Sequence, residues 1–433
     1  MDRKIVVQVA GALLRWSTLG RMGTRTVGKD VRKIVEGIET TADARAGAIA
    51  RAKREVLEEM GAYLERRGVV GADESGREDA VAVSSTLMDT SVVRDKVFRS
   101  AQGEGVRIVV KGRVNTIGLQ KRVRRLLGDS MQMERLRATQ RHNSQLLEEY
   151  GNLEERNRRI AELGRPSEQG ELRKAFDDTT RKLTAQEHLD KAQALWDGLE
   201  YRDHKMAIDY INEAIKLVPD YPLYHFYRGN ANYYWEQYQP ALRDFGQAIA
   251  LNGQYAEALN NRGIVHYRMG DYPPAIADYE QAVLHKPDYA DALNNHGNAC
   301  YKQRNFEQAL DYYGRALALD PGNALYYNNR AISHDGLGQS DRALEDYARA
   351  IELDPALATA YFNRGRSHAH RGDHREAIAD FTRAIGMDRR HAEAYFERGN
   401  AYYTSGQKGV ARRDWRKAAK LGHKEARHLK DRK

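Results

Sequence analysis

An interval of 34 residues recurs through the second half of this chain and constrains its fold more than any other feature. An alanine stands at seven positions with this step, a second alanine follows seven residues after each, and a large residue lies between the two. One unit of this length cannot bury its own apolar face, so such units must stack on one another. The pattern predicts a helical solenoid over residues 188–425. The columns are Ala207, Ala241, Ala275, Ala309, Ala343, Ala377, Ala411; Ala214, Ala248, Ala282, Ala316, Ala350, Ala384, Ala418; and Ile211, Phe245, Tyr279, Tyr313, Tyr347, Phe381, Trp415.

Each column has a physical reason in a pair of antiparallel helices. Helices approach closely only where the crossing residues are small, and Gly or Ala stands there in most units, as at Gly297 and Ala331. The aromatic residue shares a helix face with the alanine four positions before it and fills the space between helices. Proline, as at Pro287, cannot continue a helix and closes several units. The chain is therefore predicted to be mainly α-helical.

The stretches AEALNNRGIVHYRMGDYPPAIADYEQAVLHKP (256–287) and ADALNNHGNACYKQRNFEQALDYYGRALALDP (290–321) resemble the tetratricopeptide repeat family. The resemblance implies seven helix-turn-helix repeats whose first helices line a concave groove for a protein or peptide partner. Two features depart from the family pattern. Leu195 stands where the first unit should have a small residue, and arginine often replaces the leucine before that residue. The arginines are Arg228, Arg262, Arg330, Arg364 and Arg398.

The groove positions that the resemblance implies carry asparagine and tyrosine. Asn amides can pair with both groups of a peptide backbone, and Tyr gives contact area at low entropy cost. The same residues could instead satisfy neighbouring repeats internally, and the sequence leaves both interpretations open. The predicted partner groove consists of Tyr233, Asn260, Tyr267, Asn294, Asn298, Tyr301, Asn328, Arg366 and Asn400.

Two specialised sites are disfavoured. The clamp by which some family members hold a C-terminal carboxylate needs lysine or arginine at positions that here hold Phe226, Asp291 and Asn295. A column of possible metal ligands also recurs every 34 residues, but stacked helices are roughly 8–10 Å apart, so these side chains cannot converge on one ion. No metal or cofactor is predicted. The column comprises His266, Cys300, His334 and His368.

The net charge of +9 lies entirely in the first part of the chain. Residues 1–128 hold 25 of the 70 Lys and Arg and 16 of the 61 Asp and Glu, and 25 − 16 = 9. A basic cluster there predicts either contact with an anionic surface or an ordinary solvated face. Nucleic acid is disfavoured because no aromatic residues interleave the cluster. Its members are Arg107, Lys111, Arg113, Lys121, Arg122, Arg124 and Arg125.

The first part is predicted to be a small α+β domain, residues 1–128 with its core at about 34–125. We expect a strand at 34–40, a helix over 42–68 that is capped by Thr41 or Asp43 and has Gly61 near its end, and strands at 91–98 and 105–114. The stretches VEGIET, ARAGAIARAKREVLEEMGAYLERR and GLQKRVRRLL resemble the N-terminal domain of flagellar assembly protein T. This resemblance implies a periplasmic or envelope location. The start of the chain is a poor export signal, so the cytoplasm is the alternative.

Between these parts, residues 129–187 are predicted to form a helical connector, possibly a coiled coil, with helices at 131–163 and 169–186. Residues 426–433 are expected to cap the solenoid with a polar tail. The sequence contains no phosphate loop, nucleophile elbow or metalloprotease motif. We therefore predict a non-enzymatic scaffold that binds a protein in its groove. The alternative function is binding of nucleic acid, lipid or an envelope polymer through the basic N-terminal domain.

Overall fold

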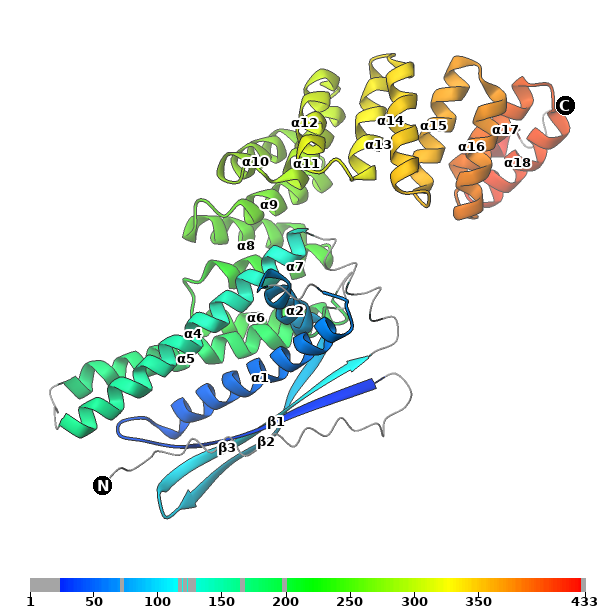
Figure 1. The fold of residues 1–433 in the computed structure, drawn as a ribbon. Helices are drawn as coiled ribbons and strands as arrows, with labels where there is room; N and C mark the ends of the chain where they lie inside the picture. The colour runs from blue at the N-terminus through cyan, green and yellow to red at the C-terminus, as the bar shows by residue number, and fades with distance from the viewer. Residues whose placement is uncertain are drawn as a thin grey trace. The chain divides into compact units, whose positions relative to one another are not determined.

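The computed structural model describes residues 24–70, 74–115, 119, 123, 130–163, 168–196 and 201–429. It divides into two compact units, Met1–Asn252 and Gly253–Lys433. Helices predominate, with one small sheet near the N-terminus, which confirms the predicted fold class (Figure 1). Among the described residues, no helix combines the length and the apolar character needed to span a bilayer.

The sheet of the first unit has three antiparallel strands in the order β1-β3-β2. They are β1 (Thr24–Ile34), β2 (Met88–Ser100) and β3 (Gly103–Asn115), so the predicted hairpin of 91–98 with 105–114 is confirmed. The predicted strand at 34–40 is wrong, because β1 ends at Ile34 and the chain then turns. Gly37 has a φ of 56°, in the left-handed region, which ends extended structure.

Helix α1 (Thr41–Arg66) lies across one face of this sheet. Thr40 is its N-cap, and Thr40 and Asp43 satisfy each other's backbone N–H groups in a capping box. The predicted cap was therefore one residue late, although Asp43 has a part in it. Helix α2 (Glu74–Leu87), which the sequence did not predict, packs on α1. Val56 and Met60 of α1 and Val106 and Ile108 of β3 are fully buried between these layers.

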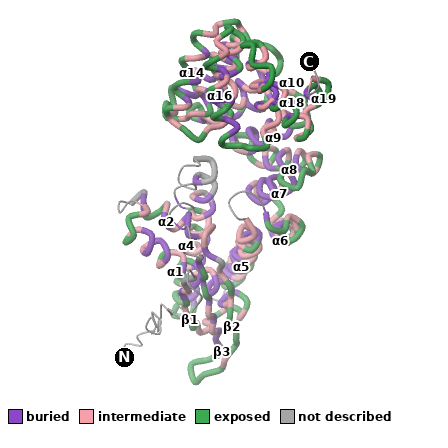
Figure 2. The backbone as a smooth tube through the Cα atoms, turned by 90° about the vertical axis from the view of Figure 1, so that its right-hand side faces the viewer, coloured by how far each residue is buried: buried purple, intermediate pink, exposed green. Residues whose placement is uncertain are grey.

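Helices α4 (Ser130–Leu163) and α5 (Gln169–Gln193) match the predicted helices in position but not in role. They form an antiparallel hairpin that packs on α1, so the boundary at residue 128 does not separate two cores. The buried Tyr150 of α4 donates its hydroxyl to Glu39 and to the Asp43 carbonyl, and its ring meets Phe176 of α5 edge-on. The spacer interpretation is corrected, because the apolar face of α4 covers α1. Figure 2 shows the buried positions of this layer.

The first unit ends with α6 (His204–Leu217), α7 (Pro222–Tyr234) and α8 (Tyr238–Leu251). The first helix of the first predicted repeat, expected from residue 188, is not a separate element. The end of α5 takes its place and packs against α6. This explains why Leu195 interrupts the small-residue column, since α5 has already ended there.

The second unit contains five helix pairs and a short terminal helix, α19 (Ala426–Leu429). A Cβ added to Gly297 would lie 2.6 Å from the ring of Tyr313, and one at Gly365 would lie 2.9 Å from Phe381. The close approach that the glycine and aromatic columns predicted is therefore present. The pairs are α9 (Ala256–Met269) with α10 (Tyr272–His285), α11 (Ala290–Lys302) with α12 (Phe306–Leu319), α13 (Ala324–Gly336) with α14 (Ser340–Leu353), α15 (Ala358–Arg371) with α16 (His374–Met387), and α17 (Ala392–Thr404) with α18 (Lys408–Lys420).

Candidate functional site

The first helices of successive pairs in the second unit form one continuous row. Helix α9 contacts α11, α11 contacts α13, α13 contacts α15 and α15 contacts α17, and these contacts are more extensive than any between successive second helices. Elements that approach each other most closely lie on the inner side of a curved stack. The row of first helices is therefore the inner face of this unit, and all the predicted groove residues except Tyr233 lie on these helices.

Asparagine pairs join the helices of this row. Asn295 donates its amide to Asn260 at 3.1 Å, Asn329 donates to Asn294 at 3.0 Å, and Asn363 donates to Asn328 at 3.1 Å. Each bond spans 35 residues, one more than the repeat length of 34, so each links nearly equivalent positions of two successive repeats. These bonds form an asparagine ladder along α9, α11, α13 and α15.

The ladder changes the interpretation of two predicted groove residues. Asn260 is fully buried and Asn328 is 5% exposed, and both side-chain oxygens accept from the next repeat. These two amides hold repeats together in the structure and offer little surface to a partner. Asn294 is half-buried, so an edge of its amide is still accessible.

The predicted tyrosines of the inner face are half-buried and held by aromatic neighbours. Tyr267 lies 5.5 Å from Tyr272, and Tyr301 lies 5.5 Å from Phe306, measured between ring centroids. In both cases the neighbour stands at the start of the following second helix. Burial is the main cause that raises the pKa of Tyr267, so its hydroxyl stays protonated at neutral pH. These rings are rigid, partly exposed surfaces, the kind that loses little entropy on binding.

Two predicted asparagines bond within their own repeat. Asn298 accepts from the Tyr313 hydroxyl at 2.8 Å, and Asn400 accepts from the indole nitrogen of Trp415 at 3.0 Å. Their oxygens are thus occupied by the aromatic column, and both side chains are half-buried. Tyr233, the ninth predicted residue, belongs to the first unit, where it packs against Tyr238.

Arg366 of α15 differs from every other predicted groove residue, because its side chain is exposed and charged. Its guanidinium lies 6.0 Å from the Phe362 ring, and no carboxylate of a described residue forms an ion pair with it. The nearby Asp335 accepts from the Tyr347 hydroxyl at 3.0 Å and from Ser367 at 2.8 Å. Asp335 therefore accepts from two hydroxyl groups and forms no ion pair with Arg366, which can accommodate an anionic group.

The arginines that replace the family's leucine form ion pairs, which the sequence analysis did not foresee. Each donates hydrogen bonds to an aspartate 16 residues later on the second helix of its pair. The bonds that Arg330 donates to Asp346 are the main cause that raises the pKa of Arg330. The aspartates recur with the same 34-residue step, which is the signal that could have revealed the pairing. The pairs are Arg228–Asp244, Arg262–Asp278, Arg330–Asp346, Arg364–Asp380 and Arg398–Asp414.

One repeat replaces this ion pair with two stacked rings. His296 and Tyr312 occupy the arginine and aspartate positions, with ring centroids 3.6 Å apart. Burial, with a smaller effect of Arg315, lowers the pKa of His296 to about 4, so its ring is neutral at neutral pH. Nearby Cys300 is buried, and burial raises its pKa to about 11. The described residues contain no group of three His, Cys, Asp or Glu side chains arranged for a metal ion.

Part of the predicted basic cluster lies on the face of the sheet opposite to α1. Arg107 pairs with Asp30, and the hydrogen bond from Arg107 is the main cause that lowers the pKa of Asp30. Lys111 and Arg113 are exposed on the same face. The other members, Lys121, Arg122, Arg124 and Arg125, lie outside the described residues.

Comparisons with known proteins agree with this geometry. A tetratricopeptide repeat model matches residues 260–324, 328–389 and 371–426, and the search of curated proteins found no match. The matched ranges exclude the N-terminal domain, so its resemblance to flagellar assembly protein T stays a prediction.

Several solved structures are similar to the chain. The crystal structure of MamA is 24% identical, with a TM-score of 0.35, and covers 38% of this chain and 96% of its own. That of YrrB, described as a tetratricopeptide repeat protein with an unusual peptide-binding site, is 26% identical with a TM-score of 0.36, at 43% and 97% coverage. One from Parabacteroides merdae is 21% identical with a TM-score of 0.48, at 57% and 97%. The column pattern, the helix pairs and the family match agree on tetratricopeptide-type repeats over residues 260–426.

Proposed function

We propose that this protein is a non-catalytic scaffold that binds an extended, acidic polypeptide segment along the inner face of its second unit. The observation that carries the proposal is Arg366, an exposed cation without a described carboxylate partner on a face whose other polar groups are largely occupied. A partner that binds here removes water from the Phe362 ring and from the Arg366 guanidinium. This favours a partner with a carboxylate close to apolar or aromatic side chains.

The repeat spacing supports an extended partner. Packed helices lie roughly 8–10 Å apart, and an extended chain advances about 3.3 Å per residue, so one repeat corresponds to about three partner residues. Half-exposed Tyr301 and Asn294 on α11 would meet one part of such a segment, and Arg366 on α15 a later part. Tyr301 and Arg366 both influence the pKa of Tyr347 electrostatically, which supports a single binding stretch that includes them.

A selection of peptides by the full-length chain tests this proposal. The immobilised protein is exposed to a phage-displayed library of random twelve-residue peptides, and the enriched clones are sequenced. We expect enrichment of clones that carry Asp or Glu beside aromatic or aliphatic residues. Arg366→Ala should lower the affinity of these clones about tenfold, since charge-assisted hydrogen bonds contribute about 1.5–3 kcal/mol.

The matched control is Arg383→Ala, which removes an exposed arginine from the second helix α16. It should leave the enriched clones bound as tightly as before. Enrichment that is equal on the wild type and on Arg366→Ala would contradict the inner-face site, and absence of any enriched clone would contradict peptide binding itself.

The outer face of the sheet supports a second candidate function, binding of a phosphate-bearing polyanion. Arg32 of β1 lies directly opposite Arg107, and Arg107 lies directly opposite Lys96 of β2. Like charges at directly opposed positions destabilise a sheet. Asp30 pairs with Arg107 and also attracts Arg32, but one carboxylate cannot balance all three cations. An anion that contacts Arg32, Arg107 and Lys96 together would remove this repulsion.

This candidate is tested by sedimentation of the full-length chain with phosphatidylglycerol vesicles and by titration with a single-stranded oligonucleotide. We expect binding to the vesicles that weakens steeply with salt and is lost in the double variant Arg32→Glu, Lys96→Glu. The charge-matched control, Arg375→Glu with Arg383→Glu, alters exposed arginines of α16 and should bind normally. Equal loss in both double variants would show that net charge alone is responsible, and binding of the oligonucleotide alone would redirect the proposal to nucleic acid.

A further inference from the structure

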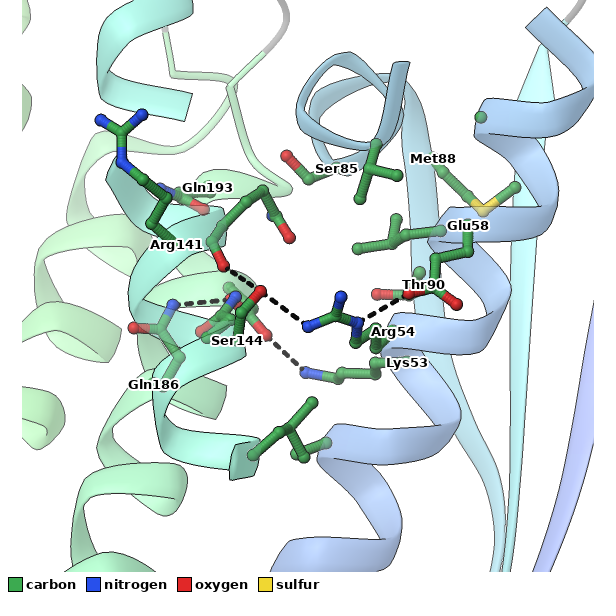
Figure 3. Close-up of a pocket in the computed structure, with 18 of the residues that line it drawn as sticks. Lys53, Arg54, Glu58, Ser85, Met88, Thr90, Arg141, Ser144, Gln186 and Gln193 are labelled. Carbon is green, nitrogen blue, oxygen red and sulfur yellow. Dashed lines mark hydrogen bonds and ion pairs between the residues drawn. The ribbon is translucent and has the colours of Figure 1, made fainter. Parts of the chain in front are cut away.

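A cavity of about 650 Å³ lies within the first unit, between α1, α2, α4, α5 and the start of β2. Figure 3 shows part of its wall, with Lys53 and Arg54 of α1 directed towards α4 and α5, which carry Ser144 and Gln186. The volume falls within the range of small-molecule sites, which is about 300–1,000 Å³. The repeats of the second unit contribute nothing to it, so it is independent of the proposed peptide face.

Much of the wall is aliphatic and comes from four different helices. Such a wall favours a ligand that buries apolar surface, at about 25 cal/mol per Å². The aliphatic lining residues are Ala46, Ile49, Ala50 and Leu57 of α1, Val81 of α2, Leu147 of α4 and Leu183 of α5.

Every charged residue of the wall already has a partner of opposite charge. Lys53 and Asp190, one such pair, are 3.0 Å apart, and Lys53 itself is 9% exposed. Because the charges cancel locally, an anion or cation entering the cavity would meet no uncompensated partner and would lose its hydration. The cavity therefore selects against charged ligands. The pairs are Lys53–Asp190, Arg54–Glu58, Arg77–Glu65, Arg141–Glu78 and Glu187–Lys191, at 2.7–3.6 Å.

Two lining glutamines each have a fully buried atom that is closed off from the open space of the cavity and has no hydrogen-bond partner among the described residues. Gln186 is 4% exposed, and its Nε2 donates to Asp190 at 2.9 Å. That bond fixes the orientation of the amide, because a carboxylate cannot accept from the carbonyl oxygen. Its Oε1 then accepts nothing from a described residue, and neither does Nε2 of Gln193 donate to one. A buried acceptor left without a partner costs about 1–3 kcal/mol.

We propose that this cavity binds a neutral, mainly apolar small molecule. Its carbon skeleton lies against Leu57 of α1 and Leu147 of α4. Binding at this site joins three helical layers and would stabilise the first unit.

The test uses two probes of similar size and opposite electrostatic character. N-phenyl-1-naphthylamine is neutral and carries one N–H donor, and 8-anilinonaphthalene-1-sulfonate is its anionic relative. Both fluoresce when they leave water, so titration of the full-length chain gives their affinities. We expect saturable binding of one molecule of the neutral probe, at least tenfold tighter than that of the anionic probe.

Cavity-filling variants locate the probe. Ala50→Phe and Leu147→Trp add bulk from opposite walls, on α1 and α4, and each should weaken binding of the neutral probe at least tenfold. The control Leu163→Trp places the same indole at a position that is 63% exposed and does not line the cavity. It should bind the probe as the wild type does.

A cooperative thermal unfolding transition shows that each variant is folded. If either Ala50→Phe or Leu147→Trp does not fold, the other still tests the site. Absence of saturable binding to the wild type would overturn the proposal. So would unchanged binding in both filling variants, which would place the probe elsewhere, or tighter binding of the anionic probe. None of these results bears on peptide binding by the repeats, so the two proposals fail separately.

Discussion

At the scale of single residues, the arginine–aspartate pairs explain the clearest departure from the family pattern. The position before the small residue faces the second helix of the same pair, where leucine would make apolar contact. Here Arg364 reaches Asp380 through Nε and Nη2, both at 2.8 Å, and Asp380 is 6% exposed. Bidentate geometry offsets much of the cost of burying the carboxylate. The sequence showed both columns, but a column by itself does not reveal which residues touch.

Removing the aspartate tests this role. Asp380→Ala leaves the Arg364 guanidinium half-buried without its partner and should lower the free energy of unfolding by about 2–4 kcal/mol. Urea denaturation of the full-length chain measures the change. Asp311→Ala serves as the control, because its pair with Arg315 is exposed and 3.9 Å long, and it should change stability by less than about 0.5 kcal/mol. Equal effects of both substitutions would contradict the role assigned to the buried pairs.

The stacked His296 predicts a pH dependence. Its pKa is about 4 in the folded chain, mainly because of burial and then because of Arg315, against a usual value of 6.5. Below pH 6.5 the unfolded chain therefore binds a proton that the folded chain does not, and stability falls as pH decreases towards 4. The loss attributable to this residue approaches about 3 kcal/mol at pH 4.

The variant His296→Phe keeps a ring against Tyr312 but cannot titrate. The stability difference between wild type and variant should be constant above pH 7 and should shift in favour of the variant between pH 6.5 and 4. Urea denaturation at several pH values measures this difference. Parallel pH profiles for the two proteins would show that His296 does not remain neutral in the folded state.

At the scale of elements, repetition decided what the sequence could predict. In the repeats, each column is sampled several times, so helix pairing and the glycine–aromatic contacts were predictable. The N-terminal domain has no repetition. There the turn at Gly37 and the capping box at Thr40 were taken for a strand, and α2 was missed. The packing of α4 and α5 on α1 was missed because an amphipathic helix does not reveal which surface it covers.

The asparagine ladder belongs to the same scale, and it divides the predicted groove residues into internal and accessible ones. Asn363→Ala removes the donor to Asn328 Oδ1, and Asn328 is buried, at 5% exposure. We expect a loss of about 1–3 kcal/mol in the free energy of unfolding. Asn305→Ala is the control, since this exposed N-cap residue makes no side-chain capping bond, and it should change stability by about 0.5 kcal/mol or less.

At the scale of the whole molecule, the chain combines two independent kinds of surface. The first unit offers a basic sheet face and a charge-balanced cavity, and the second offers an inner face of rigid tyrosines with one unpartnered arginine among the described residues. Composition located the excess charge in residues 1–128. It could not show that Arg32 and Lys96 join Arg107 in one row, because that depends on the strand register.

The central claim is that the inner face of the repeats binds an acidic polypeptide through Arg366. Calorimetric titration of the most enriched acidic peptide into the full-length chain tests it most directly, with Arg366→Ala and Arg383→Ala measured under the same conditions. We expect one peptide bound per chain. Arg366→Ala should lower the peptide affinity about tenfold, and Arg383→Ala should leave the affinity unchanged. Equal affinity for all three proteins would contradict it.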